Sequence, residues 1–141
     1  MGGRGKNLSL TAKHAMEERI RAALFAELSD QGISFSRGKT KFITRDHDGK
    51  VTWLEMGNEK AGLTHILEKH ADDFRKTMDL MPSQIPNHIR MVVERGEIVS
   101  STLGKGGTRK VYKLDGHYYT VVVTGSNGYI VTAHPLSARR K

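Results

Sequence analysis

Histidine is the residue type in this chain best suited to chemistry, because its ring takes up and releases protons near neutral pH. The 141 residues contain seven histidines, and two of them, His65 and His70, lie five residues apart in the segment THILEKH. A helical zinc motif needs a spacing of four and a glutamate beside the first histidine. Five residues instead turn a helix by about 500°, leaving the rings roughly 140° apart except near a helix end or bend. The segment therefore predicts no metal site.

The candidate histidines differ in their surroundings. His65 lies near the predicted start of a helix, where the helix dipole favours the neutral ring and so suits a general base. His70 lies on the apolar stripe of the same helix, and helical spacing alone favours a buried, hydrogen-bonded core residue. His88 lies on the apolar stripe of the next helix, and we expect it to pack there. His134 ends the last predicted strand, two residues after Thr132, and is a second-rank candidate.

The composition excludes several classes of protein. The chain has no cysteine, so it has no disulfides, thiolate nucleophiles or cysteine-ligated zinc or iron–sulfur sites. Its length suits one compact domain, and 37% of its residues are hydrophobic. No apolar run approaches the 18 or so residues of a membrane span. The opening MGGRGKN lacks the hydrophobic region of a signal peptide.

Positive charge is concentrated towards the C-terminus. The chain has 23 Lys and Arg against 15 Asp and Glu, a formal charge of +8. Residues 101–141 hold seven basic side chains against Asp115 alone. This excess indicates a surface for a polyanion or a solvated, solubilising face. The partner could be nucleic acid, an acidic protein, or both.

The glycine-rich segment GKGGTRK at 104–110 is the other notable motif. It lacks the spacing of a nucleotide-binding loop and leads into a strand, not a helix. We interpret it as a flexible, basic loop that borders an RNA groove, or as a plain connection. Under the first interpretation the RNA-binding side chains are Lys105, Lys110 and Lys113.

Apolar periodicity predicts helices first and strands afterwards, which is an α+β organisation. We expect the helices to cover one face of an antiparallel sheet and to leave the other face free. The predicted helices are 11–30, 59–80 and 84–95, the last capped by Ser83; a hairpin or irregular flap falls in 33–56; and the predicted strands are 97–103, 109–114, 117–124 and 129–134.

The faces of the sheet depend on its turns. Asp115-Gly116 favours a two-residue turn, which would place Arg109 opposite Val122 and group Lys110 with Val121 on the other face. Whether Thr132 shares a face with Arg109 depends on the length of the loop before it, and this stays open.

Two motifs resemble those of a known group of nucleases. GLTHILEKH at 62–70 contains an Ile-x-x-Lys-His pattern. GYIVTAHPL at 128–136 contains a Thr-Ala-x-Pro pattern. With the helix after the prolines and the C-terminal meander, they resemble the barnase–EndoU–colicin–RelE-like (BECR) superfamily. Its members include phage-associated ribonucleases and the ends of contact-dependent inhibition and other polymorphic toxins. The resemblance covers about residues 60–137.

The resemblance implies a fold and a set of site residues. The fold would be N-terminal helices packed on a C-terminal antiparallel sheet, with a nuclease core at 59–141. The residues before the core lie outside the resemblance, and we expect there a flexible basic segment at 1–10 and a helix and flap at 11–58, in one compact domain overall. The helix motif implies catalytic roles for His70 and His65, the last strand one for Thr132, and the preceding hairpin one for Arg109. Where the family often has an aromatic residue, this chain has His134, which would either stack on substrate or take over part of the active site.

The implied activity is that of a metal-independent endoribonuclease without a cofactor. A histidine would take the proton of a ribose 2′-OH, the oxygen would attack the adjacent phosphate, and a 2′,3′-cyclic phosphate would form. We expect RNA, with tRNA foremost, as substrate and a cognate acidic immunity protein as partner. The chain would be a monomeric toxin fragment, delivered to act in the cytoplasm of a target cell.

Two other functions fit parts of the sequence. A non-catalytic nucleic-acid-binding module needs only the basic C-terminal third and tyrosines on which bases stack. A phage structural or morphogenesis accessory has weak support in the GGRG opening. Loss of RNA cleavage with retained binding in His70→Ala or Thr132→Ala would separate the nuclease from the binding module.

Overall fold

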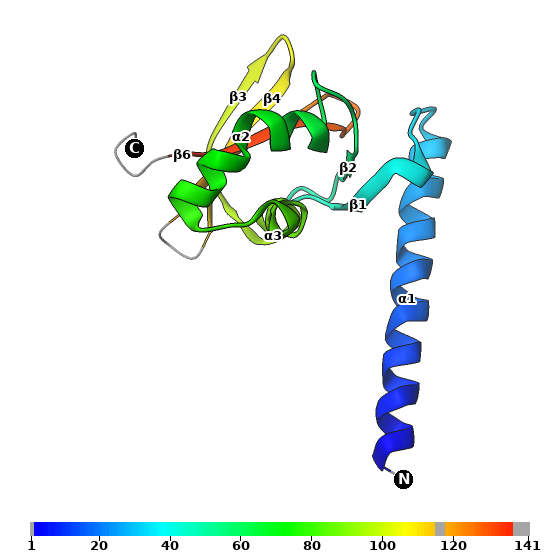
Figure 1. Cartoon of the computed structure of the whole chain (residues 1–141). Coiled ribbons are helices and arrows are strands. Elements are labelled where there is room, and N and C mark those ends of the chain that lie inside the picture. The colour runs from blue at the N-terminus through cyan, green and yellow to red at the C-terminus, as the bar shows by residue number, and fades with distance from the viewer. Residues whose placement is uncertain (1, 115–117, 137–141) are drawn as a thin grey trace. The chain divides into compact units, whose positions relative to one another are not determined.

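The computed structural model describes residues 2–114 and 118–136, with side chains from residue 11 onward. The chain divides into two compact units, residues 1–35 and 36–141. The first consists mainly of one long helix, α1 (Gly2–Asp30), drawn in blue in Figure 1. It confirms the helix predicted over 11–30. It also continues back to Gly2, where the sequence suggests a flexible segment, because no proline interrupts it and each added residue gains one backbone bond.

The second unit begins with a short 3₁₀ turn, η1 (Arg37–Lys39), and the predicted hairpin of β1 (Thr40–Arg45) and β2 (Val51–Glu55). The turn between the strands is closed by Asp46, whose N–H donates to the Lys50 carbonyl at 2.8 Å. The Asp46 carboxylate in addition accepts the N–H groups of Asp48 and Lys50. The DHDGK segment thus forms the tight turn that its composition predicts.

Two helices follow the hairpin, close to their predicted positions. They are α2 (Leu63–Met78) and α3 (Ile85–Arg95), separated by the 3₁₀ turn η2 (Pro82–Gln84). The expected cap from Ser83 is wrong: Ser83 lies inside η2, and Gln84 takes the N-cap position of α3 without a side-chain cap. The prolines explain the difference, since Pro82 favours the first turn of a helical segment and starts η2 early. No helix in the described residues is long and apolar enough to cross a bilayer.

The C-terminal part is a four-stranded antiparallel meander in the order β3-β4-β5-β6. Its strands are β3 (Glu97–Gly104), β4 (Gly107–Leu114), β5 (Tyr118–Thr124) and β6 (Ile130–Leu136). Gly104 pairs with Gly107, so the segment expected to be a mobile loop is a tight hairpin turn of two residues, Lys105 and Gly106. Helices before an antiparallel sheet confirm the predicted α+β class.

The register of β4 and β5 corrects the sequence interpretation. Leu114 pairs with Tyr118 and Arg109 with Val123, so three residues separate the paired ends. The predicted turn at Asp115-Gly116 lies outside the described residues, but a two-residue loop would have paired Leu114 with His117. The expected faces are therefore wrong, because a shift of one residue moves every side chain of a strand to the other face.

The core lies on one face of this sheet. Tyr112, Val122 and Ala133 are buried there in one cluster with apolar side chains of α2, α3 and the β1–β2 hairpin. Helix α2 packs against β6, which passes behind it in Figure 1, and α3 packs against β4 and β5. The opposite face carries Arg109 and His134 besides buried valines. The face expected to be polar and free therefore mixes Arg109, Thr132 and His134 with the buried Val111 and Val121.

Candidate active site

The start of α2 is fixed to the edge strand of the sheet. Gly62, just before the helix, donates its N–H to the Val131 carbonyl of β6 at 2.8 Å. Its φ is +88°, and a Cβ atom there would lie 2.8 Å from the Tyr129 hydroxyl and 2.9 Å from the Glu55 carbonyl oxygen. Only glycine fits such a conformation at such close approach. This junction determines where the side chains of α2 stand relative to β6.

Three histidine rings meet beside this junction. The His70 ring centroid lies 5.7 Å from that of His65 and 5.1 Å from that of His134 on β6. His65 and His70 approach despite their spacing of five because His65 stands in the first turn of α2, near the helix end. Helical spacing alone favoured a place for His70 in the buried core. His70 instead lies outside the core cluster: its side chain is 23% exposed and faces the other two rings.

Each of the three rings has an oxygen acceptor at Nδ1. His65 contacts the Glu59 carbonyl at 2.9 Å, His70 the Asp73 carboxylate at 3.3 Å, and His134 the Pro135 carbonyl at 3.1 Å. Because a carbonyl or carboxylate oxygen only accepts, each Nδ1 carries the proton in these contacts. The lone pair of each neutral ring is then on Nε2, which is the nitrogen able to accept a proton from a substrate.

Burial lowers the pKa of His134 below its usual value of 6.5, and the nearby charges of His70 and Arg109 lower it further. The hydrogen bond to the Pro135 carbonyl and the charge of Asp73 act in the opposite direction. The net effect keeps His134 neutral at pH 7, the state required of a general base.

Arg109 and Thr132 lie on the same sheet face as His134. Val123 pairs with Arg109 on one side and with Thr132 on the other, and Val121, two residues away on β5 and so on the same face, pairs with His134. Residues directly opposite in a ladder share a face, so Thr132 shares a face with Arg109, which the sequence alone left open. Among the described residues, the Thr132 hydroxyl is a buried oxygen with no hydrogen-bond partner. An unpaired buried hydroxyl is costly and is suited to donate to a bound group.

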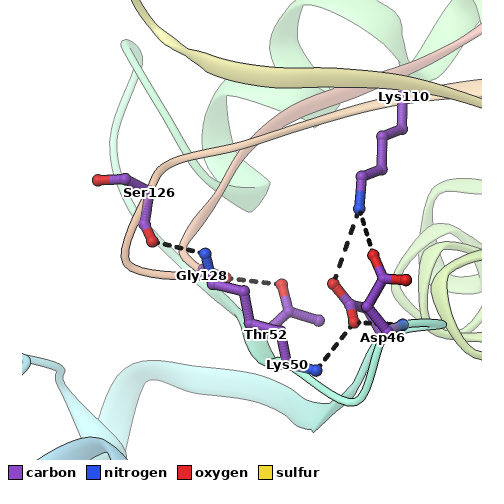
Figure 2. A network of polar contacts seen from close by, with 7 residues as sticks. Asp46, Lys50, Thr52, Lys110, Ser126 and Gly128 are labelled. Atoms are coloured by element: carbon purple, nitrogen blue, oxygen red, sulfur yellow. Dashed lines mark hydrogen bonds and ion pairs between the residues drawn. The ribbon is translucent and has the colours of Figure 1, made fainter. Parts of the chain in front are cut away.

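The three candidate lysines lie in different surroundings. Lys113 is on the Arg109 face, and Lys105 is in the β3–β4 turn. Lys110 is on the opposite face, where its ammonium lies 3.5 Å from the Asp48 carboxylate and 3.9 Å from that of Asp46 (Figure 2). An RNA-binding role of all three stays a prediction, and Lys110 already has anionic partners.

A comparison with protein families agrees with this geometry. The family described as "phage-Barnase-EndoU-ColicinE5/D-RelE like nuclease1" matches residues 46–139. The chain belongs to this phage BECR nuclease family. The match covers about two-thirds of the chain and includes every candidate site residue. No curated protein matches the chain.

Sequence reasoning missed one polar neighbour of this BECR nuclease site. Asp73 contacts His70 from one turn further along α2. Its spacing of three residues was the available signal, because residues three apart are neighbours on a helix surface. His88, in contrast, packs as expected: its ring lies edge-on to Phe74 at 5.7 Å and its Nε2 is 3.0 Å from the Thr120 hydroxyl.

Proposed function

We propose that this BECR nuclease is an endoribonuclease that cleaves RNA by attack of the 2′-OH, leaving a 2′,3′-cyclic phosphate, without a metal ion. The observation that carries the proposal is the pair of rings of His70 and His134, 5.1 Å apart, on the side of the sheet that also bears Arg109 and Thr132. Two imidazoles at this separation can serve the two oxygens of one phosphodiester. The reaction requires such a pair, one group to take the proton of the 2′-OH and one to give a proton to the leaving 5′ oxygen.

In the proposed reaction, His134 is the base and His70 the acid. Nε2 of neutral His134 takes the proton of the 2′-OH, and the oxygen forms a bond to the adjacent phosphorus. The bond from phosphorus to the 5′ oxygen breaks, and protonated His70 gives its Nε2 proton to that leaving oxygen. Asp73 accepts from Nδ1 of His70 and holds the ring in orientation. His65 contacts the His70 ring edge-on and restricts it from the other side.

Arg109 and Thr132 stabilise the charge that develops on the phosphoryl oxygens. A guanidinium offers a fixed fork of donors to a phosphate. The Thr132 hydroxyl gains in the transition state a partner that it lacks in the described structure. Donors that are already positioned act strongly because they need no reorganisation during the reaction.

Incubation with total RNA and with single-stranded DNA tests this chemistry. RNA should be cut to fragments with 2′,3′-cyclic phosphate ends, with EDTA present or absent, and DNA should survive because it lacks the 2′-OH. Equal cutting of DNA, or loss of RNA cleavage in EDTA, would refute the mechanism. RNA binding without cleavage would support the non-catalytic binding module instead.

As to its biological role, we propose that the domain is a toxin fragment that acts on tRNA in the cytoplasm of a target cell, as a monomer. A cell that makes such an enzyme needs a cognate immunity protein. The +8 charge favours an acidic one, since complementary charge speeds capture. Mapping of the cleaved ends tests whether tRNA is the substrate. Co-expression with the product of a neighbouring acidic reading frame tests the immunity protein and should restore the growth of cells that make the toxin.

A further inference from the structure

A pocket of about 330 Å³ lies between two turns at one end of the sheet. One turn joins β3 to β4, and the other joins β5 to β6. The close approach of Gly107 to Thr124 brings them together, since a Cβ on Gly107 would lie 2.2 Å from the Thr124 carbonyl oxygen. The mechanism proposed above does not use this pocket.

The wall formed by the β5–β6 turn is held by hydrogen bonds from Lys50 and Thr52. Figure 2 shows the Lys50 ammonium donating to the Ser126 carbonyl and the Thr52 hydroxyl donating to the Gly128 carbonyl. The Asn127 side-chain oxygen accepts the Tyr129 N–H at 3.0 Å. This last bond uses the amide oxygen of Asn127 and leaves its NH₂ group as the donor on that side chain.

The other wall is the β3–β4 turn with Lys105 and Gly106. A Cβ on Gly106 would meet nothing within 4 Å, so the space beside this backbone is open. None of the nine lining residues, all within the described part of the chain, carries a carboxylate. Four of the lining residues have side chains that can donate, namely Lys105, Thr108, Ser126 and Asn127. A site with one cation, several donors and no carboxylate suits an anion.

The pocket lies at the end of the sheet that is nearer to Arg109 and Thr132 than to His134. Thr108 in its lining precedes Arg109 on β4. The row of Thr108, Thr124 and Ile130 lies nearest the turns, and the row of Arg109, Val123 and Thr132 follows it. His134 lies two rows beyond Thr132, further from the turns. An RNA strand whose scissile phosphate contacts Arg109 can therefore continue past the turns without crossing the histidine cluster.

We propose that this pocket is a subsite for the backbone phosphate of the nucleotide next to the cleaved bond. The inference rests on the proposed ribonuclease function and specifies its substrate: single-stranded RNA longer than a dinucleotide, held by a second phosphate. Lys105 supplies the charge, and the Asn127 amide supplies a donor fixed in direction.

The test compares substrates of increasing length. Cleavage of a dinucleoside monophosphate is measured beside oligoribonucleotides extended by one nucleotide on the 5′ or the 3′ side, at low salt. Extension on one side should raise kcat/KM of the natural protein. Asn127→Asp keeps the oxygen that accepts from Tyr129 but replaces the donor with a negative charge. It should lower the long-to-short ratio of kcat/KM about tenfold.

Two further variants complete the test. Gly106→Asp places a carboxylate in open space on the opposite wall and should lower the same ratio. Lys41→Ala removes an exposed lysine of β1 and should leave the ratio unchanged. A ratio preserved in both folded Asp variants overturns the subsite, as does an equal fall of the ratio in Lys41→Ala.

Binding of uncleavable 2′-deoxy oligonucleotides of the same lengths separates the two proposals. If the natural protein cleaves no RNA, the proposed function fails, and the subsite is judged by affinity alone. A gain in affinity with one added phosphate, lost in Asn127→Asp, supports the subsite in that case. Affinity that does not change with length overturns it.

Discussion

The Thr132 hydroxyl has opposite effects on stability and on function. It is buried without a partner among the described residues, and a buried hydroxyl that makes no hydrogen bond costs about 1–3 kcal/mol of stability. Thr132→Val removes the oxygen with little change of shape. We expect it to raise the free energy of unfolding by about 1 kcal/mol and to lower kcat about 100-fold.

Thermal unfolding and single-turnover cleavage measure these two effects, and Thr132→Ser is the matched control. The serine keeps the hydroxyl and should keep most of the activity. If valine lowers stability and leaves cleavage intact, Thr132 has no part in the reaction.

The lowered pKa of His134 gives a second prediction at the residue scale. Because the ring stays neutral as the pH falls to 6.5, the acid limb of kcat/KM should lie below 6.5. Arg109→Gln removes a charge that lowers this pKa, so the pKa should rise. Asp73→Asn removes a charge that raises it, so the pKa should fall. NMR titration of the His134 ring measures all three values.

The same shift affects stability. A folded-state pKa below 6.5 means that the unfolded chain binds more protons between the two values, so stability decreases as the pH falls through 6.5. A His134→Asn variant should lose this part of the pH dependence. If His134 titrates at or above 6.5 in the folded protein, it is not the neutral base of the proposed reaction.

At the scale of elements, the junction between α2 and β6 determines whether the histidines meet. Gly62→Ala would place a methyl group 2.9 Å from the Glu55 carbonyl oxygen at a φ of +88°. We expect a loss of about 2–4 kcal/mol in the free energy of unfolding. Cleavage should fall even below the melting temperature, because α2 must move relative to His134. Denaturant unfolding and kcat check the two parts. Unchanged stability would show that the junction tolerates a side chain.

The contact between the β1–β2 turn and the sheet depends on Lys110. Its side chain is 18% exposed and neutralises the carboxylates of Asp46 and Asp48. Lys110→Met leaves these two charges close together without their cation, and we expect a loss of about 1–2 kcal/mol. Adding Asp48→Asn should restore part of the loss. Denaturant unfolding of the four proteins in this double-mutant cycle gives the coupling. Additive effects would mean that the contact contributes nothing.

These elements also show what the sequence could and could not predict. The 3.6-residue period located α2 and α3 within a few residues because one face of each is buried. The register of β4 and β5 was not readable, because Val121 and Val122 are both buried on opposite faces. The alternation therefore favoured neither face. The meeting of His70 with His134 depends on the Gly62 junction, a contact between segments about 70 residues apart, and local patterns do not contain it.

At the scale of the whole molecule, the position of each charge matters more than the total. Residues 101–141 carry seven of the basic side chains, yet Lys110 is paired while Arg109 and Lys113 share the site face. Counterion release makes binding to single strands weaken with salt by a slope of about 0.7 per phosphate contact. Arg109, Lys105 and Lys113 together should therefore give a slope of about −2 in a plot of log K against log salt.

Two lysines of β4, three residues apart on opposite faces, make this a matched comparison. Lys113→Met should reduce the magnitude of the slope by about 0.7, because it removes one phosphate contact. Lys110→Met should leave the slope unchanged in protein that is still folded, because the Lys110 ammonium is held by Asp46 and Asp48. Fluorescence anisotropy of a labelled 2′-deoxy oligonucleotide at several salt concentrations gives both slopes. If Lys110→Met reduces the slope as much as Lys113→Met, RNA contacts both faces of the sheet and the site is not confined to the face of Arg109.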